Sequence, residues 1–357
     1  MRMPAVTVLM PVYNAQKFLR AAMESILQQT LHDFEFLIID DGSTDDSLAI
    51  IQSFADPRIR LYQNEQNLGI SATLNKGIEL ATAPLIARMD ADDISYPDRL
   101  QRQVDYLQKN PACAMVSSLV KVVDEQGRFL RQDVFKSEYF YYNLTFICWI
   151  YHPTVLYRKA AVQSVSGYTA PYAEDFELFW QLSRKYPIHN LPQVLLDYRV
   201  TSQSLHQVLR KAEYASAQQE QILRNIQYYT GPDCVVPSTY IECYQHNFLP
   251  LLQKREVQEM VRCLRMLDDL TKQILLKDNP NRNVEAIQKA AVYKKRYIVD
   301  SLLPHLAWTQ SIYLLLSVFS LKDLVKFCRA KRIEAKRKDT QPEQFPAPHL
   351  TPELSLA

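Results

Sequence analysis

The chain has 357 residues, of which 47% are apolar and 22% are charged, so its composition is that of a folded globular protein rather than a disordered one. Lys and Arg (41) nearly balance Asp and Glu (39), so charge gives no reason to expect a nucleic acid as the main partner. Only six glycines are present, and neither G-x-G-x-x-G nor G-x-x-x-x-G-K-[ST] occurs. A nucleotide would therefore be bound without a glycine-rich phosphate loop.

The first half of the chain alternates predicted strands and helices. Apolar runs rich in β-branched residues at 6–13 and 34–41 predict buried parallel strands. Between them, residues 15–29 carry apolar side chains at helical spacing, and Asn14 is the expected N-cap. The alternation continues with a helix at 45–54, a strand at 59–62, a helix at 71–81, a strand at 85–89 and a helix at 97–108. This order predicts right-handed βαβ units on a parallel sheet.

The pattern changes after Cys113. Residues 113–124 and 128–134 predict a hairpin, and a strand at 153–157, a helix at 174–185 and a strand at 191–199 complete a mixed sheet. Later residues have helical patterns at 207–228, 250–276, 282–302 and 308–331. We predict three parts, which are an α/β domain at 1–206, a helical region at 207–338 and a loose, proline-containing tail at 339–357.

The cysteines and the hydropathy pattern indicate the compartment. None of the six cysteines forms a C-x-x-C pair, so we expect buried thiols rather than a zinc site. The N-terminus lacks the layout of a signal peptide, and no apolar run reaches the ~18 residues that a membrane span requires. We expect a cytoplasmic protein with reduced thiols.

Two carboxylates end the second predicted strand. Ser43 to Asp46 are explained as residues that cap the next helix, but Asp40 and Asp41 still belong to the strand. Because ligands of open α/β sheets bind beyond the carboxyl ends of strands, these two are candidate ligand-binding residues.

Two further acidic clusters follow predicted elements. Asp90, Asp92 and Asp93 come directly after the strand at 85–89, and three carboxylates so close together repel one another unless a cation lies among them. A solvated acidic turn is the alternative. Glu174 and Asp175 begin a predicted helix, where acids are common as caps and where a general base could also stand.

Together and in this order, these segments resemble the family 2 glycosyltransferases of the GT-A fold. The matching segments include VTVLMPVYNAQKFLRAAMESILQQT, FEFLIIDDGSTDDS, NLGISATLNKGIELA, LIARMDADDISYPDRLQRQ, HPTVLYRKAAV, SGY, AEDFELFWQL and LLDYRV. The resemblance covers about residues 5–205. It implies a Rossmann-like α/β domain, with a mixed, mostly parallel sheet flanked by helices, followed by an all-helical region.

The resemblance also implies an activity. It implies an inverting, hexosyltransferase-type enzyme that uses Mn²⁺ or Mg²⁺ and moves one sugar from a nucleotide-sugar donor to a hydroxyl of a glycan or lipid-linked acceptor. Such enzymes act in cell-surface glycan synthesis, as of lipopolysaccharide or capsule. A UDP-sugar is the default donor, because a carboxylate at Asp41 suits a base with an N–H donor, and GDP- and dTDP-sugars stay open. The Gln-x-x-Arg-Trp pattern of processive synthases is absent, which favours transfer of a single sugar.

Roles for individual residues follow from the same resemblance. Asp175 would be the catalytic base. Asp92, with Asp90, would hold the metal, and Asp90 would lie nearer the ribose. Tyr13 would pack on the nucleotide base and Arg199 would lie near the diphosphate. The full donor-binding set is Pro11, Tyr13, Asp40, Asp41, Asn67, Asn75, Arg88, Asp90, Asp93 and Arg199. The roles of His152 and His206 stay open.

Two other functions compete with this one. A nucleotidyltransferase on a related α/β sheet would need a glycine-rich loop with a basic residue after the first strand, and MPVYNAQ has no glycine there. An inactive nucleotide-sugar-binding scaffold would not need the acidic residues, which are all present.

The C-terminal part of the helical region predicts a membrane contact. Residues 308–321 are strongly apolar, and residues 322–338 carry eight Lys or Arg against Asp323 and Glu334, a net +6. This combination at 307–338 suits an anionic membrane surface, which would make the protein peripheral on the inner face of the cell membrane. A core-packing helix with a solvated end is the alternative.

Overall fold

The computed structural model describes residues 3–132, 137–201 and 211–325. The chain divides into two compact units that exchange short segments. We call them the sheet unit (Met1–Phe140, Cys148–Gln218 and Asn279–Asn281) and the helical unit (Tyr141–Ile147, Gln219–Asp278 and Arg282–Ala357). The predicted boundary at 206/207 lies outside the described residues.

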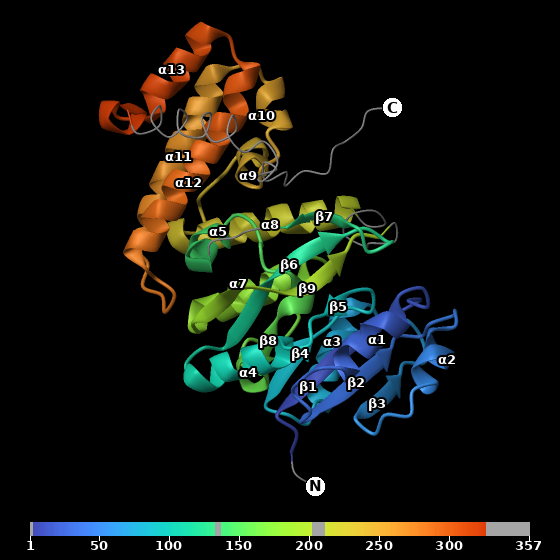
Figure 1. Ribbon diagram of the computed structural model, residues 1–357. Coiled ribbons are helices and arrows are strands. Elements are labelled where there is room, and N and C mark those ends of the chain that lie inside the picture. The colour runs from blue at the N-terminus through green and yellow to red at the C-terminus, as the bar shows by residue number, and fades with distance from the viewer. Residues whose placement is uncertain (1–2, 133–136, 202–210, 326–357) are drawn as a thin grey trace, which may run out of the picture. The chain divides into compact units, whose positions relative to one another are not determined.

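The described residues of the sheet unit form one mixed sheet of nine strands (Figure 1). Their bounds are β1 (Val6–Val12), β2 (Phe34–Asp40), β3 (Ile59–Gln63), β4 (Leu85–Arg88), β5 (Ile94–Ser95), β6 (Met115–Val123), β7 (Phe129–Gln132), β8 (Leu156–Arg158) and β9 (Ile188–Arg199). The order across the sheet is β3-β2-β1-β4-β8-β6-β9-β5, and β7 pairs with β6. The mixed, mostly parallel α/β sheet expected from the sequence is thereby confirmed.

The strand directions bring several strand ends to one edge. Strands β3, β2, β1 and β4 are mutually parallel, and β8 is antiparallel both to β4 and to β6. Because β9 is parallel to β6, both run in the direction of β4. The carboxyl ends of β1, β2, β4, β6 and β9 therefore share one edge with the beginning of β8, and that edge is where a ligand is expected.

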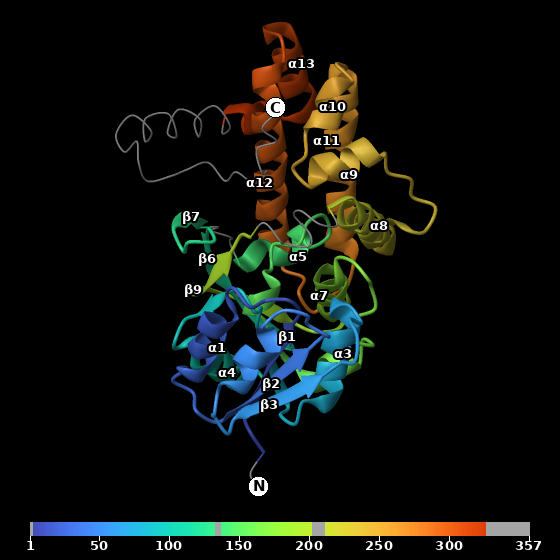
Figure 2. The same cartoon turned by 90° about the vertical axis from the view of Figure 1, so that its right-hand side faces the viewer.

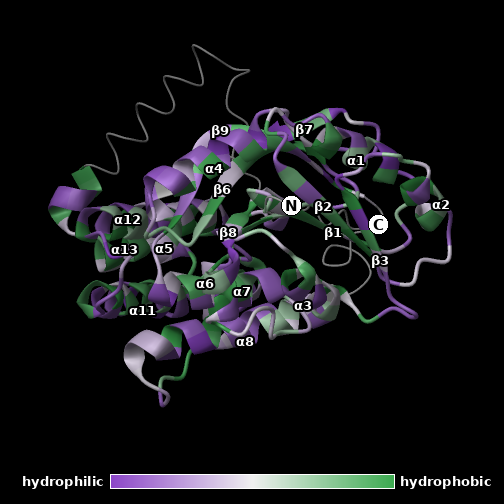
Figure 3. Cartoon of the chain, turned by 90° about the horizontal axis from the view of Figure 1, so that it is seen from below, coloured by the Kyte–Doolittle hydropathy of each residue, from purple (hydrophilic) through white to green (hydrophobic). Residues whose placement is uncertain are grey.

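Helices cover both faces of this sheet. Their bounds are α1 (Leu19–Leu27), α2 (Ser47–Gln52), α3 (Ile70–Leu80), α4 (Arg99–Lys109), α6 (Lys159–Gln163) and α7 (Glu174–Lys185). Helices α1 and α4 lie on one face and α3 and α7 on the other (Figure 2). All seven residues of β2 are buried, as expected for a central strand covered on both sides. Figure 3 shows hydrophobic residues along the central strands and mixed hydropathy on the helices.

Two predicted details of the sheet unit are wrong. Asn14 does not cap α1, because it adopts a left-handed conformation (φ 50°) and its Oδ1 accepts a hydrogen bond from Thr44 N at 2.8 Å. The helix begins at Leu19 after Phe18 instead. The strand predicted at 153–157 begins later, at Leu156, because His152–Thr154 form a 3₁₀ helix with proline in its first turn.

The helical unit is built around one long helix. Its elements are α5 (Phe140–Asn143), the later part of α8 (Lys211–Thr230), α9 (Ser238–Tyr244), α10 (Leu249–Gln253), α11 (Val257–Leu276), α12 (Val284–Leu302) and α13 (Trp308–Val318). Helix α11 contacts α12 and α13 and buries Met260, Leu264, Leu267 and Ile274 at helical spacing. Within the described ranges, no helix combines the length and the apolar character that crossing a bilayer requires.

Two predicted helices of this unit are interrupted. The helix expected at 250–276 is two helices, because Arg255 between them has φ 55°. The helix expected at 308–331 is interrupted after Val318, because Phe319 is extended, and residues 321–325 are helical again. Its part beyond residue 325 lies outside the described residues.

Candidate functional site

The turn after β2 is organised around two buried carboxylates. Asp41 Oδ1 accepts hydrogen bonds from Asn64 Nδ2 (2.7 Å) and Leu68 N (3.0 Å), and its Oδ2 accepts one from Gly69 N (3.0 Å). Asp40 Oδ1 accepts one from Ser43 N at 3.2 Å. Asp41 N also donates to Val12 O at the end of β1 (2.7 Å). The two predicted carboxylates therefore shape the loop beside β1 and β2, and Oδ2 of Asp41 keeps capacity for a second donor.

Gly42 completes this turn. It has φ 75°, and a Cβ at this position would lie 2.9 Å from the backbone carbon of Gln66. Only glycine allows the 64–69 loop to approach the turn so closely.

Three carboxylates meet after β4. Oxygens of Asp90, Asp92 and Asp93 lie within 4.8 Å of one another. Burial, followed by the charge of Asp90, raises the pKa of Asp92 to about 7, and burial with the charges of Asp92 and Asp90 raises the pKa of Asp93 well above its usual value. Asp93 Oδ2 is buried and has no hydrogen-bond partner among the described residues. Such crowded oxygen ligands fit a divalent cation, which would relieve their repulsion.

Two arginines hold the segment that carries these carboxylates. Arg88, which is buried, forms an ion pair with Asp90. Arg199, at the end of β9, donates from its backbone N to Asp93 Oδ1 (2.7 Å) and from Nε to Asp92 O (2.8 Å). Its Nη1 donates to the carbonyls of Asp124 and Glu125, each at 3.1 Å. The predicted residues Arg88, Arg199 and Asp90 to Asp93 are thus brought together.

Other predicted residues lie around this edge with different surroundings. Tyr13 follows β1 and is 50% exposed, whereas Pro11 lies within β1. Asn67 Oδ1 accepts a hydrogen bond from Gly69 N at 3.0 Å. Asn75 on α3 uses both ends of its amide on Tyr168, donating to its carbonyl (2.8 Å) and accepting from its N–H (2.9 Å). In this structure, Asn75 therefore anchors the segment that leads toward α7.

Asp175 stands in the first turn of α7, beside a buried acid. Its Oδ1 accepts a hydrogen bond from Phe176 N at 2.7 Å. Burial and then the charge of Asp175 raise the pKa of the neighbouring Glu174 to about 8, and Asp90 also contributes. The interaction of Glu174 with both Asp175 and Asp90 places α7 in the electrostatic field of the carboxylate cluster.

A buried polar group lies beneath Glu174. His152 Nε2 is 2.7 Å from the hydroxyl of Tyr168, and its Nδ1 is 3.8 Å from Glu174 Oε1. Burial lowers the pKa of His152 well below its usual value, so the imidazole is neutral. His152 is a buried neighbour of the site, and His206 lies outside the described residues.

Sequence reasoning missed two residues that support this edge. Asn64 follows β3 directly, so the rule that pointed to Asp40 and Asp41 would also have found it. Arg99 is fully buried on α4 and donates to the carbonyls of Arg88 and Pro153. Arg99 lies within the segment LIARMDADDISYPDRLQRQ that resembles the family, but its residue type gave no reason to expect a buried, supporting role.

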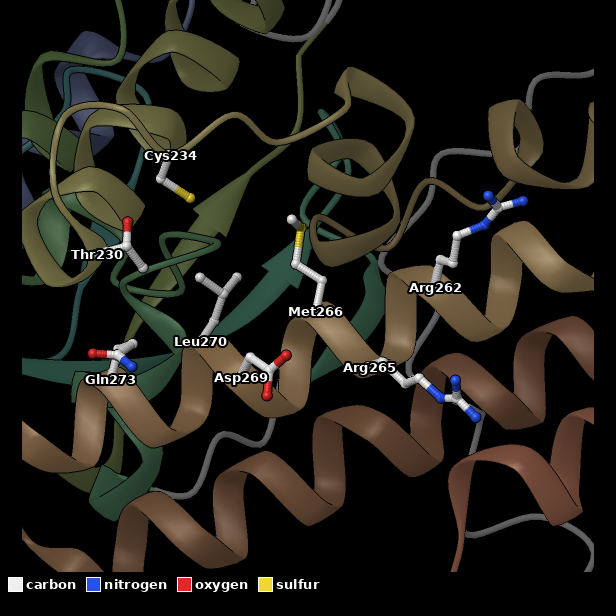
Figure 4. A pocket seen from close by; sticks show the side chains of 8 residues that line it. All are labelled: Thr230, Cys234, Arg262, Arg265, Met266, Asp269, Leu270 and Gln273. Atoms are coloured by element: carbon white, nitrogen blue, oxygen red, sulfur yellow. The ribbon is translucent and has the colours of Figure 1, made fainter.

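A separate cavity of about 500 Å³ opens in the helical unit (Figure 4). It is lined by Thr230, Cys234, Arg262, Arg265, Met266, Asp269, Leu270 and Gln273. None of the predicted site residues lines this cavity, and most of its lining comes from α11.

Comparison with known proteins finds glycosyltransferases by family model and by sequence. Residues 7–166 match the sequence model of glycosyl transferase family 2. The amylovoran biosynthesis glycosyltransferase AmsE of Erwinia amylovora is 32% identical over 204 residues, which cover 55% of this chain and 76% of AmsE. The O-antigen biosynthesis glycosyltransferase WbnJ of Escherichia coli is 27% identical over 273 residues, which cover 72% of this chain and 93% of WbnJ.

A solved structure has the same fold. Residues 1–349 of S. aureus TarS, crystallised with UDP-GlcNAc, superpose with a TM-score of 0.54 over 85% of this chain and 93% of that chain. The sequences are 16% identical, so this likeness concerns the fold, which is the GT-A arrangement expected from the sequence.

Proposed function

This chain belongs to glycosyl transferase family 2 and is a glycosyltransferase; we propose that it transfers one sugar from a nucleotide-sugar donor to an acceptor hydroxyl with inversion at the anomeric carbon. The observation that carries the proposal is the Asp90, Asp92 and Asp93 cluster, which lies at the same sheet edge as the Asp41 turn. A diphosphate held at the cluster and a nucleoside held at the turn would span the carboxyl ends of β4, β1 and β2.

We propose a UDP-sugar as donor. The capacity of Asp41 Oδ2 for a second donor suits a uracil N–H, and TarS was crystallised with UDP-GlcNAc. Tyr13 is exposed enough for its ring to pack against the base.

We propose that Asp92 and Asp90 hold Mn²⁺ or Mg²⁺. The cation would offset the negative charge that develops on the nucleoside diphosphate as it leaves. The protein's own part is to keep the carboxylates in place, which Arg88 does through Asp90 and Arg199 does through Asp92 and Asp93.

Asp175 is the proposed general base. As the acceptor oxygen attacks the anomeric carbon, its proton moves to the Asp175 carboxylate, and the bond to the diphosphate breaks on the opposite face. A single displacement of this kind needs no protein nucleophile. Burial and the charge of Asp175 raise the pKa of the neighbouring Glu174 to about 8.

Release of UDP from a UDP-sugar in the presence of Mn²⁺ tests these roles. We expect Asp92→Ala to lose Mn²⁺-dependent UDP binding, and Asp175→Asn to keep UDP binding while UDP release falls at least ~100-fold. Asp98→Asn, which changes an exposed carboxylate paired with Arg102, is the control and should match the parent. Full activity of Asp175→Asn would refute the base assignment, and UDP binding without release by the parent would indicate a scaffold.

We further propose an acceptor in cell-surface glycan synthesis, either a glycan or a lipid-linked one. AmsE and WbnJ are named for amylovoran and O-antigen biosynthesis, which supports this class of pathway.

We propose that α13 contacts a membrane surface, and that this surface is the inner face of the cell membrane. Trp308, Ile312 and Leu316 share one side of the helix and are 75%, 47% and 60% exposed. Leu314 and Val318, on the other side, are buried. The basic residues that follow raise the attraction to anionic lipid, although those at 326–338 lie outside the described residues.

Co-sedimentation with vesicles tests the membrane contact. We expect the parent to pellet with phosphatidylglycerol vesicles and not with phosphatidylcholine vesicles, and the double variant Trp308→Ser, Leu316→Ser to stay in solution. Leu276→Ser, which removes a leucine of α11 that is as exposed as Trp308, is the control. Equal pelleting of the parent and the double variant would contradict a contact through α13.

A further inference from the structure

The two carboxylate oxygens of Asp41 are used unequally by the protein. Oδ1 accepts hydrogen bonds from Asn64 Nδ2 (2.7 Å) and from Leu68 N (3.0 Å), whereas Oδ2 accepts, among the described residues, only from Gly69 N (3.0 Å). A carboxylate oxygen has two lone pairs and accepts about two hydrogen bonds. Oδ1 is therefore saturated by the protein, and Oδ2 keeps room for one donor from a ligand.

The amide of Asn64 is held in the orientation that this contact needs. Its Oδ1 accepts a hydrogen bond from Lys76 Nζ at 2.6 Å, so its Nδ2 is directed at Asp41. Lys76 lies on α3, and its ammonium group is also 4.2 Å from the centroid of the Tyr62 ring on β3. The backbone N of Asn64 donates to Asp40 O at 2.8 Å. Hydrogen bonds thus run from Lys76 through Asn64 to Asp41, and each of the three residues has few other positions open to it.

Nucleotide bases differ in the number of N–H donors that they present to a carboxylate. Uracil and thymine present one N–H between two carbonyl oxygens, whereas guanine presents two adjacent N–H donors that match the two oxygens of a carboxylate. At Asp41 the first donor of guanine could use Oδ2, but the second would meet Oδ1, which Asn64 and Leu68 already occupy. An N–H that loses water and gains no acceptor weakens binding, so this arrangement favours a base with a single donor.

We propose that Asn64, held by Lys76, selects the base of the donor by saturating Asp41 Oδ1, so that the site takes a uracil or thymine nucleotide in preference to a guanine nucleotide. The inference rests on the proposed donor site and adds the residues that decide which nucleotide it takes. Asn64 acts through Asp41 and Lys76 acts through Asn64, so both are positioning residues.

Isothermal titration calorimetry with UDP, dTDP and GDP in the presence of Mn²⁺ tests this selection on the full chain. We expect the parent to bind UDP or dTDP at least ~10-fold more tightly than GDP. Asn64→Ala frees one acceptor position on Asp41 Oδ1, so this affinity ratio should fall about 10-fold. Lys76→Met should lower the ratio less, because it releases the Asn64 amide without removing it. Lys76→Arg, which can still donate, should keep the ratio of the parent.

The affinity ratio separates base selection from a loss of structure. A variant that is only destabilised binds UDP, dTDP and GDP more weakly in the same proportion and keeps the ratio of the parent. Lys109→Met, which removes an exposed lysine from α4, is the control and should bind all three nucleotides as the parent does.

Three results would overturn the selection. Equal affinity of the parent for UDP and GDP would do so and would leave the proposed transferase intact. An unchanged ratio in Asn64→Ala, or in Lys76→Met if Asn64→Ala does not fold, would have the same meaning. Failure of the parent to bind any of the three nucleotides would overturn the selection and the proposed donor site together.

Discussion

Asn75 connects two segments that are far apart in the sequence. Its amide donates to and accepts from the backbone of Tyr168, and Ser71, one turn earlier on α3, donates to Ala170 O at 2.6 Å. The resemblance to the family places Asn75 in the donor pocket, whereas these contacts give it a positioning role.

The variant Asn75→Asp separates the two roles. The carboxylate of this variant can still accept the hydrogen bond from Tyr168 N, but it has no N–H to donate to the Tyr168 carbonyl. Loss of this hydrogen bond should destabilise the protein by about 1–3 kcal/mol. We expect a lower Tm by circular dichroism with donor affinity reduced less than twofold. A large loss of UDP affinity at unchanged Tm would show instead that Asn75 contacts the donor.

Lys294 is a buried amine in the helical unit. It is 1% exposed, and its Nζ is 3.4 Å from His246 Nε2 and 5.2 Å from the centroid of the Phe146 ring. Burial lowers the pKa of Lys294 to about 7, and burial with the nearby Lys294 lowers the pKa of His246 to about 2. The folded protein therefore holds a largely neutral lysine above pH 7.

Replacing Lys294 by Met should stabilise the protein in a pH-dependent way. Between the folded pKa of about 7 and the unfolded value near 10.5, the unfolded chain binds more protons, so parent stability rises with pH. Below pH 7 the buried lysine is charged, and this charge lowers the free energy of unfolding by its full amount, on the order of a few kcal/mol. We expect Lys294→Met to raise Tm by about 5–10 °C at pH 6 and by much less at pH 10. Lys289→Met, on the exposed side of α12, should show neither effect, and a gain independent of pH would contradict the neutral lysine.

A helix or strand was predicted correctly from the sequence where the pattern of its own side chains determines its type and its bounds. The buried run of β2 and the bounds of α7 follow from local pattern, and both are confirmed. Asn14, Arg255 and Phe319 were not predictable in this way, because their backbone angles depend on what packs around them. The candidate site could also be predicted only in part. Its acidic clusters are visible in the sequence, but the hydrogen bonds from Arg199 to three backbone carbonyls are not.

We expect an alanine substitution at Gly42, in the turn between β2 and α2, to be far more damaging than the same substitution at Gly127. Gly42 and Gly127 have almost the same φ, 75° and 78°, but a Cβ at Gly127 would meet nothing within 4 Å. Gly127→Ala should cost about 1–2 kcal/mol, the strain of the left-handed conformation. Gly42→Ala adds a backbone clash, so we expect a larger fall in Tm and weaker UDP binding. Equal effects of the two substitutions on Tm would contradict the close approach of the 64–69 loop.

Each unit of the molecule contains chain from both halves of the sequence. In the sheet unit, Asn281 donates to the carbonyls of Ser183 and Tyr186 and accepts from Ile188 N. In the helical unit, Tyr142 bonds to Thr271 at 2.9 Å, and Phe146 packs on Tyr244. A linear pattern of helices and strands cannot show such exchange, so the sequence alone predicted a simple succession of domains.

Truncation should reveal this exchange. A chain that ends at Gln218 lacks Asn281 and exposes Tyr142 and Phe146, so we expect it to bind the dye ANS and to unfold at a lower temperature than the parent. A chain that ends at Val325 keeps all of these contacts and should behave as the parent. A cooperative, dye-free 1–218 fragment would show that the two short segments contribute little.

The reversal of β8 has a consequence for how such an enzyme diversifies. Because β8 runs against β4 and β6, the chain that leaves the end of β6 and returns at the start of β8 begins and ends at the same edge of the sheet. Insertions or exchanges within that excursion alter what borders the reaction while the strand order beneath it is preserved. Because residues 141–147 of this excursion also pack in the helical unit, we expect such exchanges in its remaining parts, where substrate choice can change without a new scaffold.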